Sequence, residues 1–512
     1  MRGVSFTALG LLFLSCAAQA QEQACQALLD WKEGAEDLRI TEATYYSNRV
    51  LRSGRDGENE TVLPPHCHVT GSFEHRMGSD GKPYAIRFAV NLPDDWNGRY
   101  LFQGGGGLNG VVREPLGDQA TGGNSALARG FAVVSNDSGH EGAGFDNSFL
   151  NDQIAMMNFT YAANAKVVDV TRPLVQAYYR TAPHHSYFVG CSTGGREGMI
   201  MAQRFPELFD GIISGAPATR TGISNIALRW FSVQLGKAAN TDPRDPFTAE
   251  EETLIMGALL SRCDALDGVT DGLIFNRQAC DFDPRALACS TSPREQCLAD
   301  DKAEALAKAM NGPVTSNGEP IYVPFPWDSG IDDPSGGVPG LLLAGGNPPE
   351  GQHGADMDDI NVEAEYIAAL QANDAMGFTG MQYNVSEFVR RGGKHLFYHG
   401  EADPWFSANE TVRYFEAMAE ANAAVKPVEE YSRLYLVPGM AHCSGGAQTV
   451  DNFDLLTPLV YWVEEGMAPN AVVATGETMP GESRPLCPYP SYARYVGGDV
   501  TDYASYSCAV PE

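Results

Sequence analysis

Basic side chains are scarce in this sequence, which has 35 lysines and arginines against 65 aspartates and glutamates and a formal net charge of −30 at pH 7. This balance disfavours binding to nucleic acid or to anionic membrane surfaces, because both require basic residues that meet phosphates. Long apolar runs are also missing after residue 20, where no stretch approaches the roughly 20 residues of a membrane-spanning helix. Repeats, heptads and low-complexity tracts are absent too. The 512 residues therefore predict a folded protein with one large core and a second module.

The first 20 residues are typical of a secretory signal peptide. Met1-Arg2 precedes an apolar run to Phe13, and Ala18-Gln19-Ala20 supplies the small residues of a cleavage site. We expect cleavage after Ala20 and a secreted or periplasmic protein. Lipidation of Cys16 is the alternative, but Phe13 stands where a lipobox usually has leucine.

Cysteine is plentiful, but no pair has the CxxC spacing of a structural zinc site. One of the 11 cysteines falls in the predicted signal peptide, which leaves an even set of ten. An even set in an exported chain predicts five disulfides. The ten are Cys25, Cys67, Cys191, Cys263, Cys280, Cys289, Cys297, Cys443, Cys487 and Cys508.

Short apolar runs alternate with helical patterns, which predicts an α/β fold. Around residues 219–381 the pattern changes to helices broken by loops, so we expect a lid domain there, inserted between core segments 21–218 and 382–512. The expected core strands are 84–90, 99–102, 131–134, 186–189, 395–398 and 434–437.

The segment Gly190-Cys191-Ser192-Thr193-Gly194 matches the G-x-S-x-G nucleophile motif. It lies between an expected strand and an expected helix, the context in which small flanking residues permit a strained turn that exposes the serine. The alternative is an ordinary strand–helix turn whose glycines serve packing. The sequence therefore predicts Ser192 as a nucleophile in an α/β-hydrolase core.

A serine hydroxyl needs an imidazole to take its proton and a carboxylate to orient that imidazole. Loops after two later strands supply both, and we predict Asp403 as the acid and His442 as the base. Glu401 is the rival acid. The rival bases are His140, His395 and His399.

Cysteines flank this predicted triad. If Ser192 and His442 lie within hydrogen-bond reach, Cys191 and Cys443 are close enough for a disulfide that joins the two loops. The glycine-rich run after strand 99–102 resembles the oxyanion loop of esterases, and it lacks the pattern of a nucleotide-binding loop. We expect the backbone N–H groups of Gly105, Gly106 and Thr193 to stabilise a developing oxyanion.

The arrangement of Cys191-Ser192, Asp403 and His442-Cys443 resembles the tannase and feruloyl esterase family, which also includes mono(2-hydroxyethyl) terephthalate hydrolases. The resemblance covers nearly the whole chain after the signal peptide. It implies the disulfide pairs Cys25–Cys67, Cys191–Cys443, Cys263–Cys280, Cys289–Cys297 and Cys487–Cys508.

An acidic loop follows Cys263, and its carboxylates suit a hard cation in a spacing that is not that of an EF-hand. Without the resemblance, a solvated acidic turn explains the loop equally well. The resemblance implies a structural Ca²⁺ ion and no organic cofactor. The implied ligands are Asp264, Asp267, Asp271 and the carbonyls of Val269 and Leu273.

The expected partner is a small ester of an aromatic acid, and the resemblance implies that Phe406 lines its pocket, with help from Trp405. Aromatic residues in or beside the predicted lid are further candidates, although each is equally a core residue. They are Trp230, Phe231, Trp327 and Tyr383. A terephthalate monoester would also need a lid arginine for its free carboxylate, and the sequence does not place one.

The chemistry predicted is attack by Ser192 on an ester carbonyl, formation of an acyl-enzyme and its hydrolysis by water. Feruloyl, galloyl and hydroxyethyl-terephthalate esters all fit that scheme. A serine peptidase shares the triad, but a large lid favours small esters. A non-catalytic binding protein on the same scaffold is the other alternative, and it is disfavoured because no predicted element of the site is missing.

Overall fold

The computed structural model describes residues 19–53, 59–238, 246–291, 296–346, 360–376 and 382–511. Its contacts divide the chain into two compact units. The first contains the residues up to Val189 together with Glu207–Asp210, and the second contains Gly190–Pro206 and the residues from Gly211 onward. Residues 1–18, most of the predicted signal peptide, lie outside the described residues.

The first unit is built on a mixed sheet with the strand order β1-β4-β5-β7-β6-β8. Its β1, β4, β5 and β7 pair antiparallel, whereas β7, β6 and β8 pair parallel. All five residues of β7 are buried, as is typical of a strand covered on both faces. The strands are β1 (Arg39–Tyr46), β4 (His66–Met77), β5 (Pro83–Pro93), β6 (Arg99–Gln103), β7 (Ala132–Asn136) and β8 (His185–Cys191), whose last two residues belong to the second unit.

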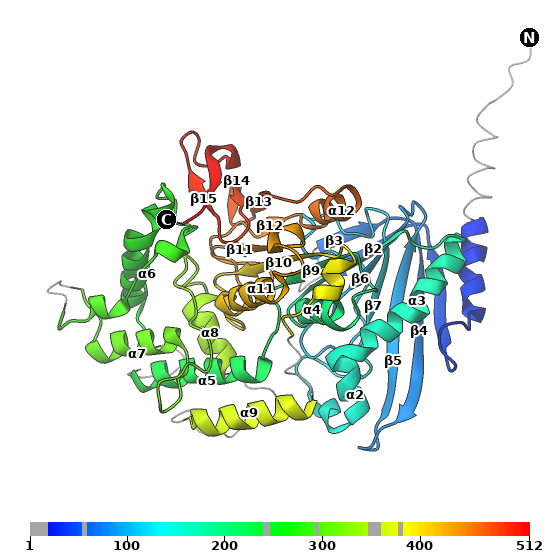
Figure 1. The fold of residues 1–512 in the computed structure, drawn as a ribbon, viewed down its shortest axis with the longest axis horizontal. Coiled ribbons are helices and arrows are strands. Elements are labelled where there is room, and N and C mark those ends of the chain that lie inside the picture. The colour runs from blue at the N-terminus through cyan, green and yellow to red at the C-terminus, as the bar shows by residue number, and fades with distance from the viewer. Residues whose placement is uncertain are drawn as a thin grey trace, which may run out of the picture. The chain divides into compact units, whose positions relative to one another are not determined.

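Helices cover this sheet and a separate hairpin accompanies it. Helix α3 packs against β5 and β7 (Figure 1). The two strands of the hairpin, β2 and β3, pair with each other in a sheet of their own. The bounds are β2 (Arg49–Ser53), β3 (Asn59–Leu63), α2 (Gln153–Met157), α3 (Ala163–Tyr179), η1 (Ala27–Asp30), η2 (Ser148–Asn151) and η3 (Asn158–Ala162).

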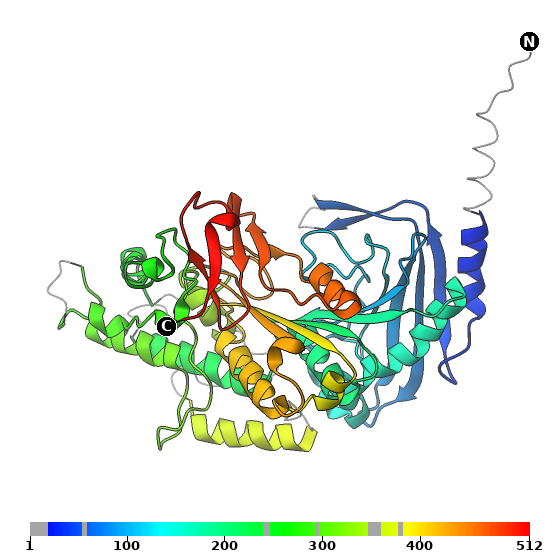
Figure 2. The same cartoon turned by 45° about the horizontal axis from the view of Figure 1, so that its top comes forward.

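The second unit contains three parallel strands, in the order β9-β10-β11, with Tyr398 of β10 opposite Gly215 of β9 and Tyr435 of β11. Two smaller sheets, β12-β13-β14 and β15-β16, follow toward the C-terminus and are orange to red in Figure 2. The strands are β9 (Gly211–Gly215), β10 (Lys394–Gly400), β11 (Ser432–Val437), β12 (Asn452–Phe453), β13 (Val472–Gly476), β14 (Met479–Leu486), β15 (Tyr492–Tyr495) and β16 (Tyr506–Ala509). The helices among them are α4 (Thr193–Arg204), α10 (Ser386–Arg390), α11 (Ala408–Asn422), α12 (Leu456–Glu465), η7 (Val428–Glu430) and η8 (Tyr503–Ser505).

A helical insertion separates β9 from α10, and we use this name for the elements α5 to α9. Helix α5 packs against α7, α8 and α9 (Figure 1), and Phe231, Leu259, Leu306 and Phe325 are among the buried residues of the insertion's own core. Its elements are α5 (Thr221–Ala238), α6 (Ala249–Cys263), η4 (Asp264–Asp267), η5 (Arg277–Ala279), η6 (Pro284–Leu287), α7 (Asp300–Asn311), α8 (Gly337–Gly346) and α9 (Val362–Met376). The insertion begins and ends close to the expected residues 219–381, but the contacts do not separate it from the rest of the second unit. An independent lid domain therefore stays a prediction.

All five implied disulfides are present, with Cα–Cα distances between 5.0 and 5.9 Å. The six expected core strands are also confirmed, and the ends of each differ from those of an observed strand by at most three residues. Among the described residues, no helix is both long and apolar enough to span a membrane.

Candidate active site

Ser192 lies at the sharp turn between β8 and α4. Its φ is 62° and its ψ is −123°, a strained backbone conformation for a residue with a side chain. Its backbone N–H donates to the carbonyl of Gly215, and its own carbonyl accepts from the N–H of Ala218. A Cβ on Gly190 would lie 2.5 Å from the carbonyl carbon of Gly194, so the turn needs glycine there. The turn has the form of a nucleophile elbow and leaves Ser192 partly exposed.

Asp403 lies in the loop after β10 and is only 3% exposed. One carboxylate oxygen, Oδ1, accepts the backbone N–H groups of Trp405 and Phe406, at 2.8 and 3.1 Å. The other, Oδ2, lies 2.7 Å from Nδ1 of His442. Burial alone would raise the pKa of Asp403, but the charge of His442 and the hydrogen bonds from His399 and His442 hold it well below its usual range. Asp403 is thus a buried carboxylate, fixed in orientation.

His442 lies in the loop after β11, and its side chain is 21% exposed. The disulfide between Cys191 and Cys443 holds the Cα atoms of these two cysteines 5.9 Å apart. Because each cysteine is next to a triad residue, the disulfide brings the loops of Ser192 and His442 together. Among the hydrogen bonds of the described residues, none joins the Ser192 hydroxyl to His442. Such bonds often tighten only when substrate is present.

A second imidazole contacts Asp403. Nε2 of His399 lies 3.1 Å from Asp403 Oδ2 and 3.0 Å from the carbonyl oxygen of Phe406, while its Nδ1 lies 2.8 Å from the Thr411 hydroxyl. Both groups near Nε2 are acceptors, so Nε2 carries the proton and Nδ1 accepts from Thr411. His399, expected only as a rival base, therefore donates to the acid.

The remaining rivals have other partners. Glu401 is buried, and Arg277 Nε lies 2.9 Å from its Oε1 in an ion pair. Burial raises the pKa of Glu401 to about 8, although Arg277 opposes that rise. His395 is buried between Phe397 and the hydroxyl of Ser214. The geometry thus favours Asp403 over Glu401 and His442 over His395.

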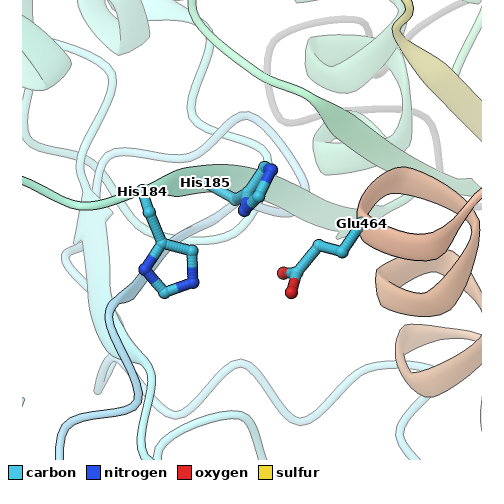
Figure 3. A group of neighbouring side chains, drawn as sticks. All are labelled: His184, His185 and Glu464. Carbon is cyan, nitrogen blue, oxygen red and sulfur yellow. The ribbon is translucent and has the colours of Figure 1, made fainter.

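Two further histidines lie at the start of β8. The rings of His184 and His185 are 5.1 Å apart and nearly perpendicular (Figure 3). Glu464, also labelled there, belongs to α12. Ser192 follows the other end of β8, so the length of the strand separates these imidazoles from the serine.

The glycine-rich loop after β6 belongs to the first unit. A Cβ on Gly105 would lie 2.0 Å from the side chain of Asn109, and one on Gly106 would lie 2.8 Å from Arg113. His140, another rival base, has its Nε2 2.9 Å from the carbonyl oxygen of Leu108 and stacks on Phe149. Burial lowers the pKa of His140 to about 4. This histidine therefore supports the end of the glycine-rich loop.

Thr193 belongs to the second unit and is the first residue of α4. Backbone N–H groups at that position point out of the N-terminal end of a helix. Its predicted role at the oxyanion, like those of Gly105 and Gly106, stays a prediction.

The predicted aromatic contacts divide into two groups. The ring of Phe406 lies 5.6 Å from the ring of His442, and Trp405 packs against the core of the helical insertion. The other candidates serve packing or hydrogen bonding: Phe231 is a core residue, Trp230 donates to the carbonyl of Lys308, Trp327 contacts Phe282, and Tyr383 accepts from Arg413.

The acidic loop after Cys263 holds three carboxylates. Asp264 and Asp267 are 2% and 1% exposed, and both accept backbone N–H groups of their own loop. Asp271 pairs with Arg484, whose Nη2 is 2.7 Å from Oδ2. Burial, together with the charges of Asp271 and Asp264, raises the pKa of Asp267 to about 7. One guanidinium does not balance three carboxylates, so this donor set suits a cation with oxygen ligands.

These carboxylates lie farther apart than the ligands of a bound metal ion. In the described part of the second unit, no three carboxylate, imidazole or thiolate ligand atoms lie within 4.8 Å of one another. The loop would therefore have to draw its carboxylates inward around an ion. The carbonyls of Val269 and Leu273 follow Asp267 and Asp271 by two residues each.

An α/β fold with a strained serine turn and a buried Asp–His pair defines a hydrolase of the α/β class. Residues 67–348 and 349–509 match the family model described as tannase and feruloyl esterase. A mono(2-hydroxyethyl) terephthalate hydrolase of Piscinibacter sakaiensis is 36% identical over 96% of this chain and 92% of its own. Feruloyl esterase B of Aspergillus niger is 29% identical over 81% of this chain and 82% of its own. The chain belongs to the tannase and feruloyl esterase family and is a carboxylic ester hydrolase.

A solved structure agrees with this assignment. An esterase from Aspergillus oryzae has a TM-score of 0.77 and 25% identity, over 95% of this chain and 100% of its own. The family model and the named relatives confirm the resemblance inferred from the cysteine-flanked triad.

Proposed function

We propose that the protein is an exported serine esterase that hydrolyses esters of small aromatic acids through an acyl-enzyme. The observation that carries the proposal is the 2.7 Å contact of His442 Nδ1 with buried Asp403, on a loop joined by the Cys191–Cys443 disulfide to the turn of Ser192. This contact leaves Nε2 of His442 as the nitrogen that takes a proton.

The geometry supports a proton path that starts at Ser192. His442 Nε2 accepts the hydroxyl proton as Ser192 Oγ attacks the ester carbonyl, and Asp403 stabilises the imidazolium that forms. As the tetrahedral intermediate collapses, His442 gives this proton to the leaving alcohol. Water then attacks the acyl group by the reverse sequence. The N–H groups of Thr193, Gly105 and Gly106 are proposed as oxyanion donors.

The proposed substrates are aromatic because Phe406, beside His442, offers a ring surface and related enzymes are named for aromatic esters. Each described arginine of the helical insertion, and the one just before it, already pairs with a carboxylate; they are Arg220, Arg229, Arg262, Arg277 and Arg285. Arg244 and Arg294 lie outside the described residues. This pairing favours uncharged acyl groups, such as feruloyl and galloyl, over the anionic terephthalate monoester.

The acidic loop is proposed to hold a structural Ca²⁺ ion through Asp264, Asp267 and Asp271, with the carbonyls of Val269 and Leu273. The ion would neutralise buried carboxylates and would take no part in proton transfer. Export is proposed because the sequence begins with a signal peptide pattern and five disulfides are stable in an oxidising compartment.

The test is hydrolysis of methyl ferulate, methyl gallate and mono(2-hydroxyethyl) terephthalate by the wild type and the Ser192→Ala variant. We expect turnover of at least one methyl ester, lost in the variant. Equal turnover by both proteins, or none by a folded wild type with intact disulfides, would overturn the proposal.

A further inference from the structure

A short segment of the helical insertion contacts both loops of the predicted acid and base. We call residues 328–340 the clamp segment. In it, Gly337 donates its N–H to the carbonyl of Ala402, next to Asp403, at 2.9 Å. Asp328 accepts the N–H of Gly439, in the loop of His442, at 2.9 Å. The acid loop and the base loop are therefore hydrogen-bonded to the same segment.

Glycines let the clamp segment approach these loops backbone to backbone. A Cβ on Gly336 would lie 2.6 Å from the carbonyl oxygen of Ala402 and 3.3 Å from Cβ of Ala441. A Cβ on Gly330 would lie 2.7 Å from Cβ of Ala402 and 3.1 Å from Cα of Gly439. Neither position has room for a side chain unless a triad loop moves.

Two buried carboxylates hold the segment in place. Asp328 is 2% exposed and also accepts the N–H of Gly330 at 2.9 Å. Asp333 is 3% exposed, accepts the N–H of Ser335 at 2.7 Å, and bonds the backbone N–H of Ala447 with its other oxygen. A buried carboxylate that joins its own turn to a neighbouring loop fixes their relative position, because a lost partner would leave a charge unsatisfied.

The acid and base loops also contact each other. The N–H of Ala402 donates to the carbonyl of Met440 at 3.0 Å, and that of Glu401 donates to Val437 at 3.0 Å. The clamp segment contacts the acid loop at Ala402 and the base loop at Gly439, next to the hydrogen bonds that join the two loops. Displacing the segment would thus move the acid relative to the base.

We propose that the clamp segment positions the catalytic acid and base, with Asp328 and Gly336 as positioning residues. The insertion then does more than cover a substrate, because it completes the scaffold that aligns Asp403 with His442. This inference rests on the proposed function, since it assumes that these two side chains are catalytic.

The first test is a steric one. In Gly336→Ala the new methyl pushes on the backbone of Ala402, and a misplacement of this kind is expected to lower kcat by about 10- to 100-fold. KM should change much less, because the variant leaves the aromatic contacts intact. Gly257→Ala is the matched control, since Gly257 belongs to α6 of the same insertion and its Cβ would meet nothing within 4 Å. The control should keep wild-type kcat.

The second test separates positioning from folding. Asp328→Asn keeps an oxygen that accepts the two N–H groups, so we expect kcat within about threefold of wild type, whereas Asp328→Ala should lose about tenfold or more. The proton NMR signal of His442 Nδ1–H should shift in Gly336→Ala and Asp328→Ala, but not in Gly257→Ala.

Two results would show that the clamp segment does not position the acid and the base. Wild-type kcat and an unshifted His442 signal in Gly336→Ala and Asp328→Ala would overturn the inference, even if their melting temperatures fell. Loss of kcat in Gly257→Ala as large as in Gly336→Ala would also overturn it. Failure of the proposed function is a different result, in which Ser192→Ala retains turnover.

Discussion

Replacing His399 with leucine removes the second imidazole from Asp403 and leaves the triad residues in place. His399 is fully buried and donates Nε2–H to Asp403 Oδ2, the oxygen that also receives His442. A hydrogen bond to a charged group contributes about 1.5 to 3 kcal/mol, so its loss at the acid should lower kcat/KM by about 10- to 100-fold. The loss arises because Asp403 can then turn away from His442.

The assay is the pH dependence of kcat/KM on the preferred methyl ester. The bond from His399 favours the ionised form of Asp403 and so contributes to its low pKa. Its removal should raise the pKa of Asp403. Protonation of the acid then adds to the loss of activity at low pH, so kcat/KM of His399→Leu should fall more steeply on the acid side than that of wild type.

His399→Gln is the matched control for this prediction. Glutamine carries two N–H groups on Nε2 that can serve Asp403 and the carbonyl of Phe406, so we expect it to retain most of the activity. A folded His399→Leu variant that keeps kcat/KM within about twofold of wild type, with an acid limb no steeper than that of wild type, would refute this role of His399.

Three further predictions concern the support of the site. Thr411→Val removes the hydroxyl that donates to His399, and kcat/KM should fall in the same direction as in His399→Leu but by less, about 3- to 10-fold. Replacing Cys191 and Cys443 by serine removes a disulfide between residues that are 252 positions apart in the chain. The same replacement of Cys289 and Cys297 removes one between residues that are 8 positions apart. Chain entropy predicts losses of about 5.5 and about 2.5 kcal/mol, so the first pair should lower the melting temperature more; the reverse order would count against this account. Asp267 has a folded pKa of about 7, above its unfolded value, so in chelator the melting temperature should fall as pH rises from 4 to 7. Added Ca²⁺ should restore it most near pH 8, and an equal calcium effect at pH 5 would contradict the predicted site.

The sequence alone predicted those elements whose structure depends on residues close together in the chain. The apolar runs at 99–102 and 186–189 became β6 and β8, because buried parallel strands consist of such runs. The serine turn could be predicted because the tight turn at Ser192 leaves no room for a side chain at Gly190, and the sequence shows a glycine there. Strand β9 (Gly211–Gly215) was missed, since its two glycines and short length are equally typical of a loop.

Contacts between distant residues that belong to neither the predicted triad nor the disulfides could not be predicted. The ion pair that removes Glu401 from the list of acids depends on Arg277, which is 124 positions earlier in the chain. The role of His399 depends on the carbonyl of Phe406 and the hydroxyl of Thr411, and sequence gives no direction for either group. The clamp segment contains no catalytic motif, and only the fold shows that Gly336 lies against Ala402.

The most direct test of the central claim is mass spectrometry of the protein after reaction with an aryl phosphonate that labels active-site serines. We predict one adduct per chain, located on the peptide that contains Ser192, with loss of esterase activity in proportion to labelling. The Ser192→Ala variant should take no label and show no turnover. An adduct on another residue, or esterase activity that survives complete labelling of Ser192, would contradict the account.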